Sequence, residues 1–449
     1  MSTDAALQSP GTGALVSRRA GGLPPGPQMP RMLQTAIWFR GAQAMLRRCH
    51  ARYGDTFKLE IAYEGTWIFV TDPDDVKRVF TGDSKLLHAG EANRILLPVV
   101  GPQSLLLLDE SEHMEHRKML LPPFHGERMK AYGELMSEIA RAEIERWPLG
   151  EPYRLRPRMQ AITLEIILRA VFGVREGERL ERLRTELRRL LDIVTNPRQA
   201  IFLLALGPER IANFGPFKRD LARVNRLIYA EIEERRHAED LDERDDILSL
   251  MLQARHEDGS PMSDSELRDE LVTLLVAGHE TTATALSWAV ERLVRHPQKL
   301  ERLTAEVADG GDEYLTAVIQ ETLRLRPVIS LVNRTLKAPM EFGGYELPAG
   351  VKVAPCIYLL HRRPDIYPEP DRFLPERFLE RPPGTYTWIP FGGGIRRCLG
   401  GAFAQFEMQV VLRELVRMRT LSPARPGDER VYRRAITETP RHDAEVLVG

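Results

Sequence analysis

Residues 391–400 read FGGGIRRCLG, and the rest of the chain can be interpreted from this stretch outward. Three consecutive glycines predict a loop whose backbone can lie close against a flat ligand, because no side chain intervenes. Cys398 then opens a segment whose pattern predicts a helix from Leu399 to about Met418. A cysteine at a helix N-terminus, beside Arg396 and Arg397, is expected to have a lowered pKa and to favour the thiolate.

A single thiolate on a glycine-rich loop suits the fifth ligand of a haem iron, where it donates electron density and favours O–O cleavage. The alternative is a buried structural cysteine that follows a turn. The pattern F-x-x-G-x-R-x-C-x-G resembles the haem-binding loop of the cytochrome P-450 superfamily at every fixed position. The resemblance implies that Cys398 binds the iron of haem b. It also implies that Phe391, Gly392, Arg396 and Gly400 contribute to cofactor binding.

Composition excludes several other classes of protein. The chain has 449 residues, 43% hydrophobic, with a net charge of -1. This balance argues against nucleic acid as the main partner. Cys49, Cys356 and Cys398 are far apart, so zinc and iron–sulfur sites are not expected, and the low count fits a reducing cytoplasm. The sequence shows no secretory signal and no apolar run of about 20 residues, so we expect a cytoplasmic protein without a transmembrane anchor.

Local patterns predict several elements along the chain. Residues 1–22 are expected to be disordered, and residues 34–52 to form an amphipathic helix. Alternating residues 56–61 and 66–71 predict a β-hairpin. Residues 88–104 are expected to form a long loop. The apolar segment 201–208, between two charged helices, is either core packing or a mobile lid that touches lipid.

Three further segments have a predicted structure near the C-terminal half. Residues 340–347 and 351–357 are expected to be short strands, and residues 431–448 a hairpin.

Ser263 and Glu266 form a capping-box pattern, and apolar residues with a helical period follow it as far as Pro297. A helix of about 32 residues would be roughly 50 Å long, so it is expected to be the central helix.

The middle of this helix departs from its apolar pattern at residues 277–282, AGHETT. Small residues leave room for a small ligand, and a carboxylate beside an alcohol can relay protons. The alternative is a solvent-facing Glu280 with two ordinary threonines. The segment resembles the oxygen-activation motif A/G-G-x-D/E-T of the same superfamily. The resemblance implies that dioxygen binds near Ala277 and Gly278 and that Glu280 and Thr281 manage its protons.

Two other motifs follow the order of the superfamily. His113 and Arg117 are four residues apart and share a helix face, which could hold the haem propionates or be simply solvated. The resemblance favours propionate binding and adds Arg334 as a further contact. It also implies a structural cluster of Glu321, Arg324 and Arg377.

These motifs imply one haem-thiolate domain over residues 23–449, similar to soluble bacterial members of actinobacterial type. The expected fold is mainly α with a smaller β-rich part, and haem lies between the central helix and the Cys398 helix. The implied activity is hydroxylation or epoxidation of a small, mostly apolar organic substrate by dioxygen, with electrons from a separate ferredoxin and its reductase. One alternative is a peroxide-using or isomerising haem-thiolate enzyme. Another is a non-catalytic haem carrier or sensor.

Overall fold

The computed structural model describes residues 22–124, 128–173, 177–195 and 215–449. The predictions for residues 1–21 and 201–208 lie outside these ranges. The longer helices are α1 (Arg31–Tyr53), α2 (Pro73–Thr81), α5 (Glu110–Leu120), α6 (Arg128–Ile144), α7 (Leu155–Phe172), α8 (Glu178–Thr195), α11 (Gly215–Arg236), α12 (Ile247–Gln253), α13 (Asp264–Val294), α14 (Pro297–Ala308), α15 (Glu313–Leu325) and α18 (Gly401–Met418). The short helical turns are α3 (Ala89–Ala92), η1 (Arg94–Leu96), α4 (Leu97–Val100), η2 (Pro122–Phe124), η3 (Leu241–Glu243), α16 (Ile357–Leu360), α17 (Arg377–Glu380) and η4 (Gly394–Arg396).

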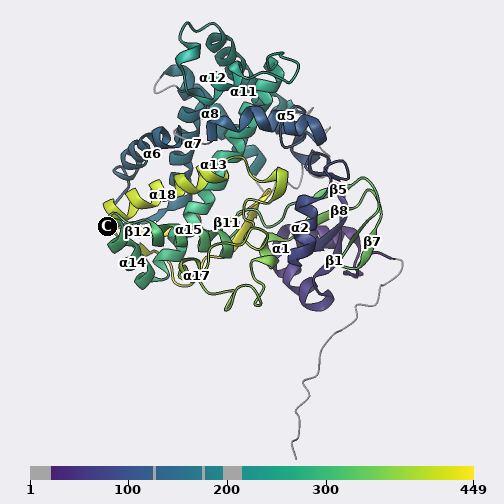
Figure 1. Ribbon diagram of the computed structural model, residues 1–449. Helices are drawn as coiled ribbons and strands as arrows, with labels where there is room; N and C mark the ends of the chain where they lie inside the picture. Colours follow the sequence, from purple (N-terminus) through teal and green to yellow (C-terminus); the bar gives the residue numbers. More distant parts are fainter. Residues whose placement is uncertain (1–21, 125–127, 174–176, 196–214) are drawn as a thin grey trace, which may run out of the picture.

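The strands form small sheets. They are β1 (Thr56–Ile61), β2 (Gly65–Val70), β3 (Leu87–His88), β4 (Pro152–Arg154), β5 (Arg334–Leu336), β6 (Met340–Phe342), β7 (Tyr345–Leu347), β8 (Lys352–Pro355), β9 (Leu421–Pro423), β10 (Val431–Arg434), β11 (Thr437–Pro440) and β12 (Glu445–Val448). The largest sheet has the order β1-β2-β8-β5-β3. Figure 1 shows this sheet beside α1 at one side of a mostly helical molecule, which confirms the predicted fold class.

The hairpin predicted from residues 56–61 and 66–71 is confirmed, with its second strand one residue earlier, at Gly65–Val70. β1 and β2 pair antiparallel, with Thr56 opposite Val70 and Ile61 opposite Gly65. Phe57, Leu59 and Ile61 point into the core and are at most 2% exposed. The alternation of the sequence therefore corresponds to one buried face in β1. β2 is buried on both faces, with Trp67 and Phe69 in one core cluster and Ile68 and Val70 in another.

The predicted central helix is also confirmed. α13 has 31 residues, and its capping box is formed: the Glu266 amide donates to Ser263 Oγ, and the Ser263 amide donates to Glu266 Oε2 at 2.7 Å. Figure 1 shows α13 running through the middle of the molecule, below α8 and α11 and next to α18. Most of its side chains are buried, so the accessible ones described below stand out.

The predicted cluster around Glu321 is present. Arg324 Nε donates to Glu321 Oε2 at 2.6 Å, and Arg377 Nε lies 3.2 Å from the same oxygen. Glu321 also accepts from the Leu374 amide at 2.8 Å. The pair is fully buried and hydrogen-bonded, which is the condition under which buried charges are tolerated. It fixes the segment that leads into the 391–400 loop.

Other local predictions were wrong in detail. Residues 340–347 are not one strand but the hairpin β6–β7, because Gly343 and Gly344 both have positive φ and turn the chain. Residues 88–104 contain the helical turns α3, η1 and α4 instead of a plain loop. In the 431–448 tail, β10 and β11 form the hairpin, whereas β12 pairs with β4 and β9. Within the described parts of the chain, every helix is too short or too polar to span a bilayer.

Candidate functional site

Cys398 lies just before α18, not at its first residue. The helix begins at Gly401, with Gly400 as its N-cap, so the predicted start at Leu399 was two residues early. The Cys398 amide donates to the Phe391 carbonyl at 2.9 Å and closes the loop on itself. Phe391 packs edge-to-face on Trp388, with ring centroids 6.1 Å apart. The loop is thus anchored at its first residue and presents its cysteine at the last turn before the helix.

The environment of the sulfur differs from the prediction of a lowered pKa. The Cys398 side chain is accessible, although protein atoms surround it. Burial raises the pKa of its thiol, while the Gly400 amide and the positive charges of Arg117 and Arg397 act to lower it. In the protein alone, burial outweighs these groups. A bound metal cation reverses this balance, since a coordinating thiol is deprotonated outright.

The three glycines of the loop serve different purposes. A Cβ on Gly393 would lie 2.5 Å from the Phe80 ring, and a Cβ on Gly394 would lie 1.9 Å from the Phe80 carbonyl oxygen. These two glycines are therefore required by packing against α2, and the prediction that all three make room for a ligand was incomplete. At Gly392, with φ of +68°, a Cβ would meet only Val332, at 4.0 Å.

His113 lies among three arginines, one of which, Arg117, is beside Cys398. His113 is buried, its Nδ1 has no hydrogen-bond partner, and burial lowers its pKa to about 3, helped by the charges of Arg396, Arg117 and Arg334. Arg334 is buried, and burial lowers its pKa to about 10. Its Nη1 donates to the Asn333 carbonyl at 2.8 Å. The structure thus brings together the four cofactor-contacting side chains expected from the sequence.

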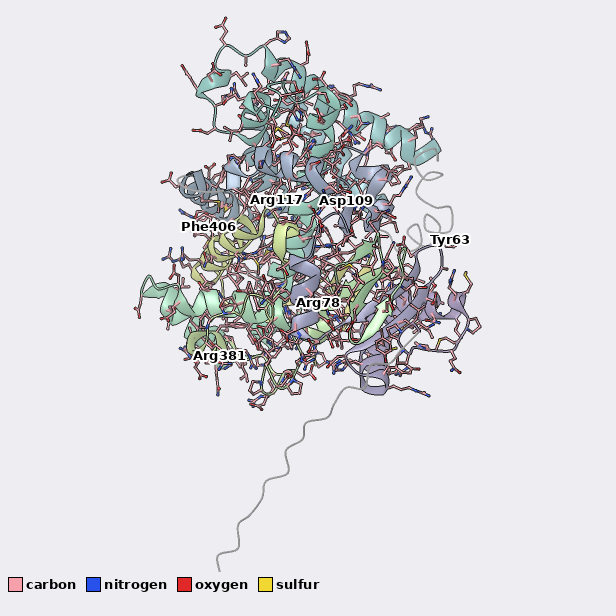
Figure 2. All side chains as sticks on the ribbon, turned by 45° about the vertical axis from the view of Figure 1, so that its right-hand side comes forward. Tyr63, Arg78, Asp109, Arg117, Arg381 and Phe406 are labelled. Carbon is pink, nitrogen blue, oxygen red and sulfur yellow. The ribbon has the colours of Figure 1, made fainter. Side chains whose placement is uncertain are left out.

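Arg396 of this group already has protein partners. Its Nη2 donates to Asp109 Oδ1 at 2.6 Å and to the Leu108 carbonyl, and its Nη1 donates to the Leu105 carbonyl at 3.2 Å. Arg117 makes no ion pair or hydrogen bond within the described residues. In Figure 2, Arg117 and Asp109 lie between the β-rich side, marked by Tyr63, and the helical side, marked by Phe406.

The residues fit a haem group by the chemistry of their donors. Asp109 neutralises the charge of Arg396. Among the described residues, no carboxylate contacts Arg117 or Arg334. Buried or half-buried cations without a carboxylate partner suit an anionic ligand. The two propionates of haem would supply that charge, and the accessible Cys398 sulfur would supply the iron ligand. Among the described residues, no group of three or more His, Cys, Asp or Glu side chains could hold a metal ion by itself.

One face of α13 is open in the middle of the helix. Ala277 is exposed and Leu274 and Thr281 are partly exposed, although neighbouring residues on other faces are buried. The Thr281 hydroxyl donates to the Ala277 carbonyl four residues back at 2.6 Å. Such a bond loosens the helix locally. Ala277 and Thr281 therefore share an accessible face.

Gly278 and the Glu280 side chain do not lie on this accessible face but face α7. A Cβ on Gly278 would lie 3.3 Å from Ile167, so this glycine allows α13 and α7 to pack closely. Glu280 is buried, accepts from Arg156 Nη1 at 3.0 Å and is also bonded to Gln160 Nε2. Burial raises the pKa of Glu280, while Arg156 and Gln160 act to lower it. The structure therefore separates the motif into an open face and a buried, ion-paired face.

Sequence reasoning missed the partners of this buried face. Arg156 Nε donates to Asp443 Oδ1 at 2.7 Å, so the C-terminal segment closes the network around Glu280. Glu407 on α18 is buried beside Thr282, and burial raises its pKa well above the usual value. No local pattern identifies these residues, because each pair joins segments more than 100 positions apart.

Comparisons with known proteins point in one direction. The sequence pattern of the Cytochrome P450 family matches residues 24–432. A Mycobacterium bovis protein provisionally named cytochrome P450 135B1 is 42% identical over 434 residues, which are 95% of this chain and 91% of the relative. A Mycobacterium tuberculosis protein provisionally named cytochrome P450 137 is 36% identical over 434 residues, with the same coverage.

A solved structure described as retinoic acid bound cyanobacterial CYP120A1 has a similar fold. It superposes with a TM-score of 0.82 and covers 95% of this chain and 99% of its own. The sequence identity is 24%, so the match concerns the fold.

Proposed function

The chain belongs to the cytochrome P450 family of haem-thiolate monooxygenases, and we propose that it hydroxylates or epoxidises a small, mostly apolar organic molecule at a haem b group ligated by Cys398. The observation that carries this proposal is the accessible Cys398 sulfur beside Arg117, a cation that contacts no carboxylate of the described residues. When bound, haem supplies the reductive activation of dioxygen and the transfer of one oxygen atom to substrate.

The residues around the cofactor have distinct proposed roles. His113, Arg117 and Arg334 would bind the propionates, and Arg396 would add to the positive potential while it holds Asp109. Phe391, Gly392 and Gly400 would shape the loop that presents Cys398. This arrangement is supported by the closeness of His113 to the three arginines, whose charges help to lower its pKa.

Thr281 and Glu280 are the proposed proton carriers. The Thr281 hydroxyl lies on the open face of α13 and can rotate from the Ala277 carbonyl toward a bound ligand. Glu280 would exchange protons only when its hydrogen bonds to Arg156 and Gln160 loosen, because these bonds hold it on the other face. Ala277 would border the dioxygen site, and Gly278 would contribute through close packing against α7.

The nature of the substrate and of the electron donor is also part of the proposal. Leu274 and Ala277 on the open face, and Val332 above Gly392, support an apolar substrate. Arg397 is exposed beside Cys398 and supports an acidic donor such as a ferredoxin with its reductase. The three cysteines are free, which supports a reducing compartment such as the cytoplasm.

Substrate titrations test the proposed chemistry. Steroids, terpenes and fatty acids would be added to the haem-loaded protein, with hydrophilic sugars of similar size as controls. We expect at least one apolar compound to shift the spin state, and its turnover with ferredoxin, reductase and ¹⁸O₂ to give a product with one ¹⁸O atom. Spin-state shifts confined to the sugars would contradict the substrate class, and product without ¹⁸O would contradict monooxygenation.

A further inference from the structure

Glu270 on α13 is a buried carboxylate with no assigned role. It is 0% exposed and lies two turns before the open face of the helix. Its Oε1 accepts from His116 Nδ1 at 2.9 Å and from the Leu105 amide at 2.9 Å. One oxygen atom of the central helix is thus bonded to both α5 and the loop that precedes it.

Both partners of Glu270 lead to the cofactor site. His116 is adjacent to Arg117 and three residues from His113 on α5. The carbonyl of Leu105 accepts from Arg396 Nη1 at 3.2 Å. A displacement of His116 would therefore move Arg117, its neighbour in the sequence. A displacement of Leu105 would move Arg396 through their hydrogen bond.

The charges around His116 favour a strong bond to Glu270. Its Nε2 lies 3.4 Å from Glu266 Oε1, and the His256 ring, which is bonded to Glu115, lies 6.0 Å away. Burial acts to lower the pKa of His116, but Glu270 and Glu266 outweigh burial and raise the pKa above its usual value. A protonated imidazole gives a charge-assisted hydrogen bond, which is stronger than a neutral one.

Neighbouring residues of α13 hold the same loop. Asp269 Oδ2 accepts from the Gln103 amide at 2.9 Å, and Thr273 is bonded to Ser104 at 2.7 Å. These bonds tie residues 103 and 104 to the helix but do not reach α5. Among these side chains of α13, Glu270 is the one that joins the loop and α5 at a single atom.

We propose that Glu270 is a positioning residue for the cofactor: through His116 and Leu105 it fixes α5 and the 102–109 loop, and with them Arg117, His113 and Arg396. The proposal rests on the proposed haem site. It adds a structural link that the motifs of the sequence do not contain.

Three variants of the haem-loaded protein test this link. Glu270→Ala removes the acceptor, whereas Glu270→Gln keeps an oxygen that can accept both hydrogen bonds. Glu291→Ala is the matched control, because Glu291 is also a buried carboxylate on the same helix. Its partners are Arg292, Arg295 and the Glu429 amide, none of which is a proposed cofactor contact. The readouts are the rate of haem transfer to apomyoglobin and the reduction potential. The CO spectrum of each reduced variant reports the Cys398 ligand separately.

We expect E270A to transfer haem about tenfold faster and to have a more negative reduction potential, because Arg117 and Arg396 neutralise the propionates less well. E270Q should restore both values to near those of the wild type, and E291A should leave them unchanged. Equal values for E270A and E291A would overturn the proposal. If E270A does not fold, Glu270→Asp, which is shorter by one methylene group, replaces it in the comparison with E291A. A wild-type CO spectrum without the thiolate signature would instead contradict the haem-thiolate site itself.

Discussion

Arg156 Nη1 lies 3.0 Å from Glu280 Oε1, and both side chains are at most 7% exposed. Replacing Arg156 by alanine would leave a buried carboxylate without its cation. We therefore expect Arg156→Ala to lower the free energy of unfolding by about 3–5 kcal/mol, measured by urea denaturation of the haem-loaded protein.

Arg158 on the same helix provides the control. It pairs with Glu143 at 3.4 Å, but its side chain is 46% exposed. Arg158→Ala should lower the free energy of unfolding by about 1 kcal/mol or less, because an exposed ion pair contributes little to stability. Equal losses in the two variants would mean that the Arg156–Glu280 pair does not hold the buried face of α13.

Thr281 should control how electrons are used. Thr281→Ala removes the hydroxyl from the open face, and proton delivery by a positioned group contributes about 10²–10⁴-fold to a rate. We expect electron consumption to continue while product per electron falls by about tenfold or more. Thr304→Ala is the control, since Thr304 makes the same bond four residues back, to Leu300 at 3.0 Å, on exposed α14. Unchanged product yield in Thr281→Ala would exclude a role in proton transfer.

The 391–400 loop should tolerate no side chain at Gly394. Gly394 has φ of +64°, and a Cβ would lie 1.9 Å from the Phe80 carbonyl oxygen. Gly150 also has a positive φ, of +78°, but a Cβ there would meet no described atom within 4 Å. We expect Gly150→Ala to lower the free energy of unfolding by about 1 kcal/mol, because of backbone strain alone. Gly394→Ala should lower it several times more, because the Cβ would also clash with Phe80. Thermal unfolding and haem content would show the difference, and equal costs would refute the packing role.

Local sequence signals predicted the elements that depend on short-range physics. The β1–β2 hairpin follows from alternation, and the start of α13 follows from the capping box of Ser263 and Glu266. The signals were weaker where the chain reverses within an alternating run, so the turn at Gly343 between β6 and β7 was missed. The first residue of a helix, such as Gly401 of α18 after Cys398, could not be predicted either, because the flanking residues fit a helical pattern equally well.

Long-range contacts explain the rest of the differences. Gly394 was expected to make room for a ligand, but Phe80, more than 300 residues away, requires it. The ion pair of Glu280 with Arg156 joins two helices, and no pattern within either helix reveals it. The family motifs predicted which side chains gather at the site, whereas the contacts that orient them became visible only in the folded chain.

His279 should make the protein sensitive to acid. Burial lowers its pKa to about 3, helped by the charges of Arg188 and Arg156. The folded pKa lies below the unfolded value of about 6.5, so this contribution to stability is full above pH 6.5 and is lost as pH falls. We expect the free energy of unfolding to fall by up to about 1.4 kcal/mol more per pH unit in the wild type than in His279→Leu below pH 6.5. Urea denaturation from pH 7 to pH 5 tests this, and parallel curves would contradict it.

Electron delivery should depend on Arg397. A ferredoxin carries negative surface charge, and reversing an exposed charge at a docking face slows association. In stopped-flow reduction at low salt, we expect Arg397→Glu to be about tenfold slower than the wild type, and the wild type to slow as salt is added. Arg381→Glu is the control and should reduce at the wild-type rate. Arg381 is exposed, and Figure 2 shows it well away from Arg117, whose charge interacts with that of Arg397. Salt-independent reduction of the wild type would contradict an electrostatic docking face.

The most direct test of the haem-thiolate site is the absorbance spectrum of the purified, reduced protein under carbon monoxide. We expect a strongly red-shifted Soret band in the wild type. The band should persist in Cys49→Ser, because Cys49 is a buried residue of α1, and it should be lost in Cys398→Ser. A Soret band at the position of imidazole-ligated haem in fresh wild-type protein, or a red-shifted band that survives in Cys398→Ser, would show that Cys398 is not the iron ligand.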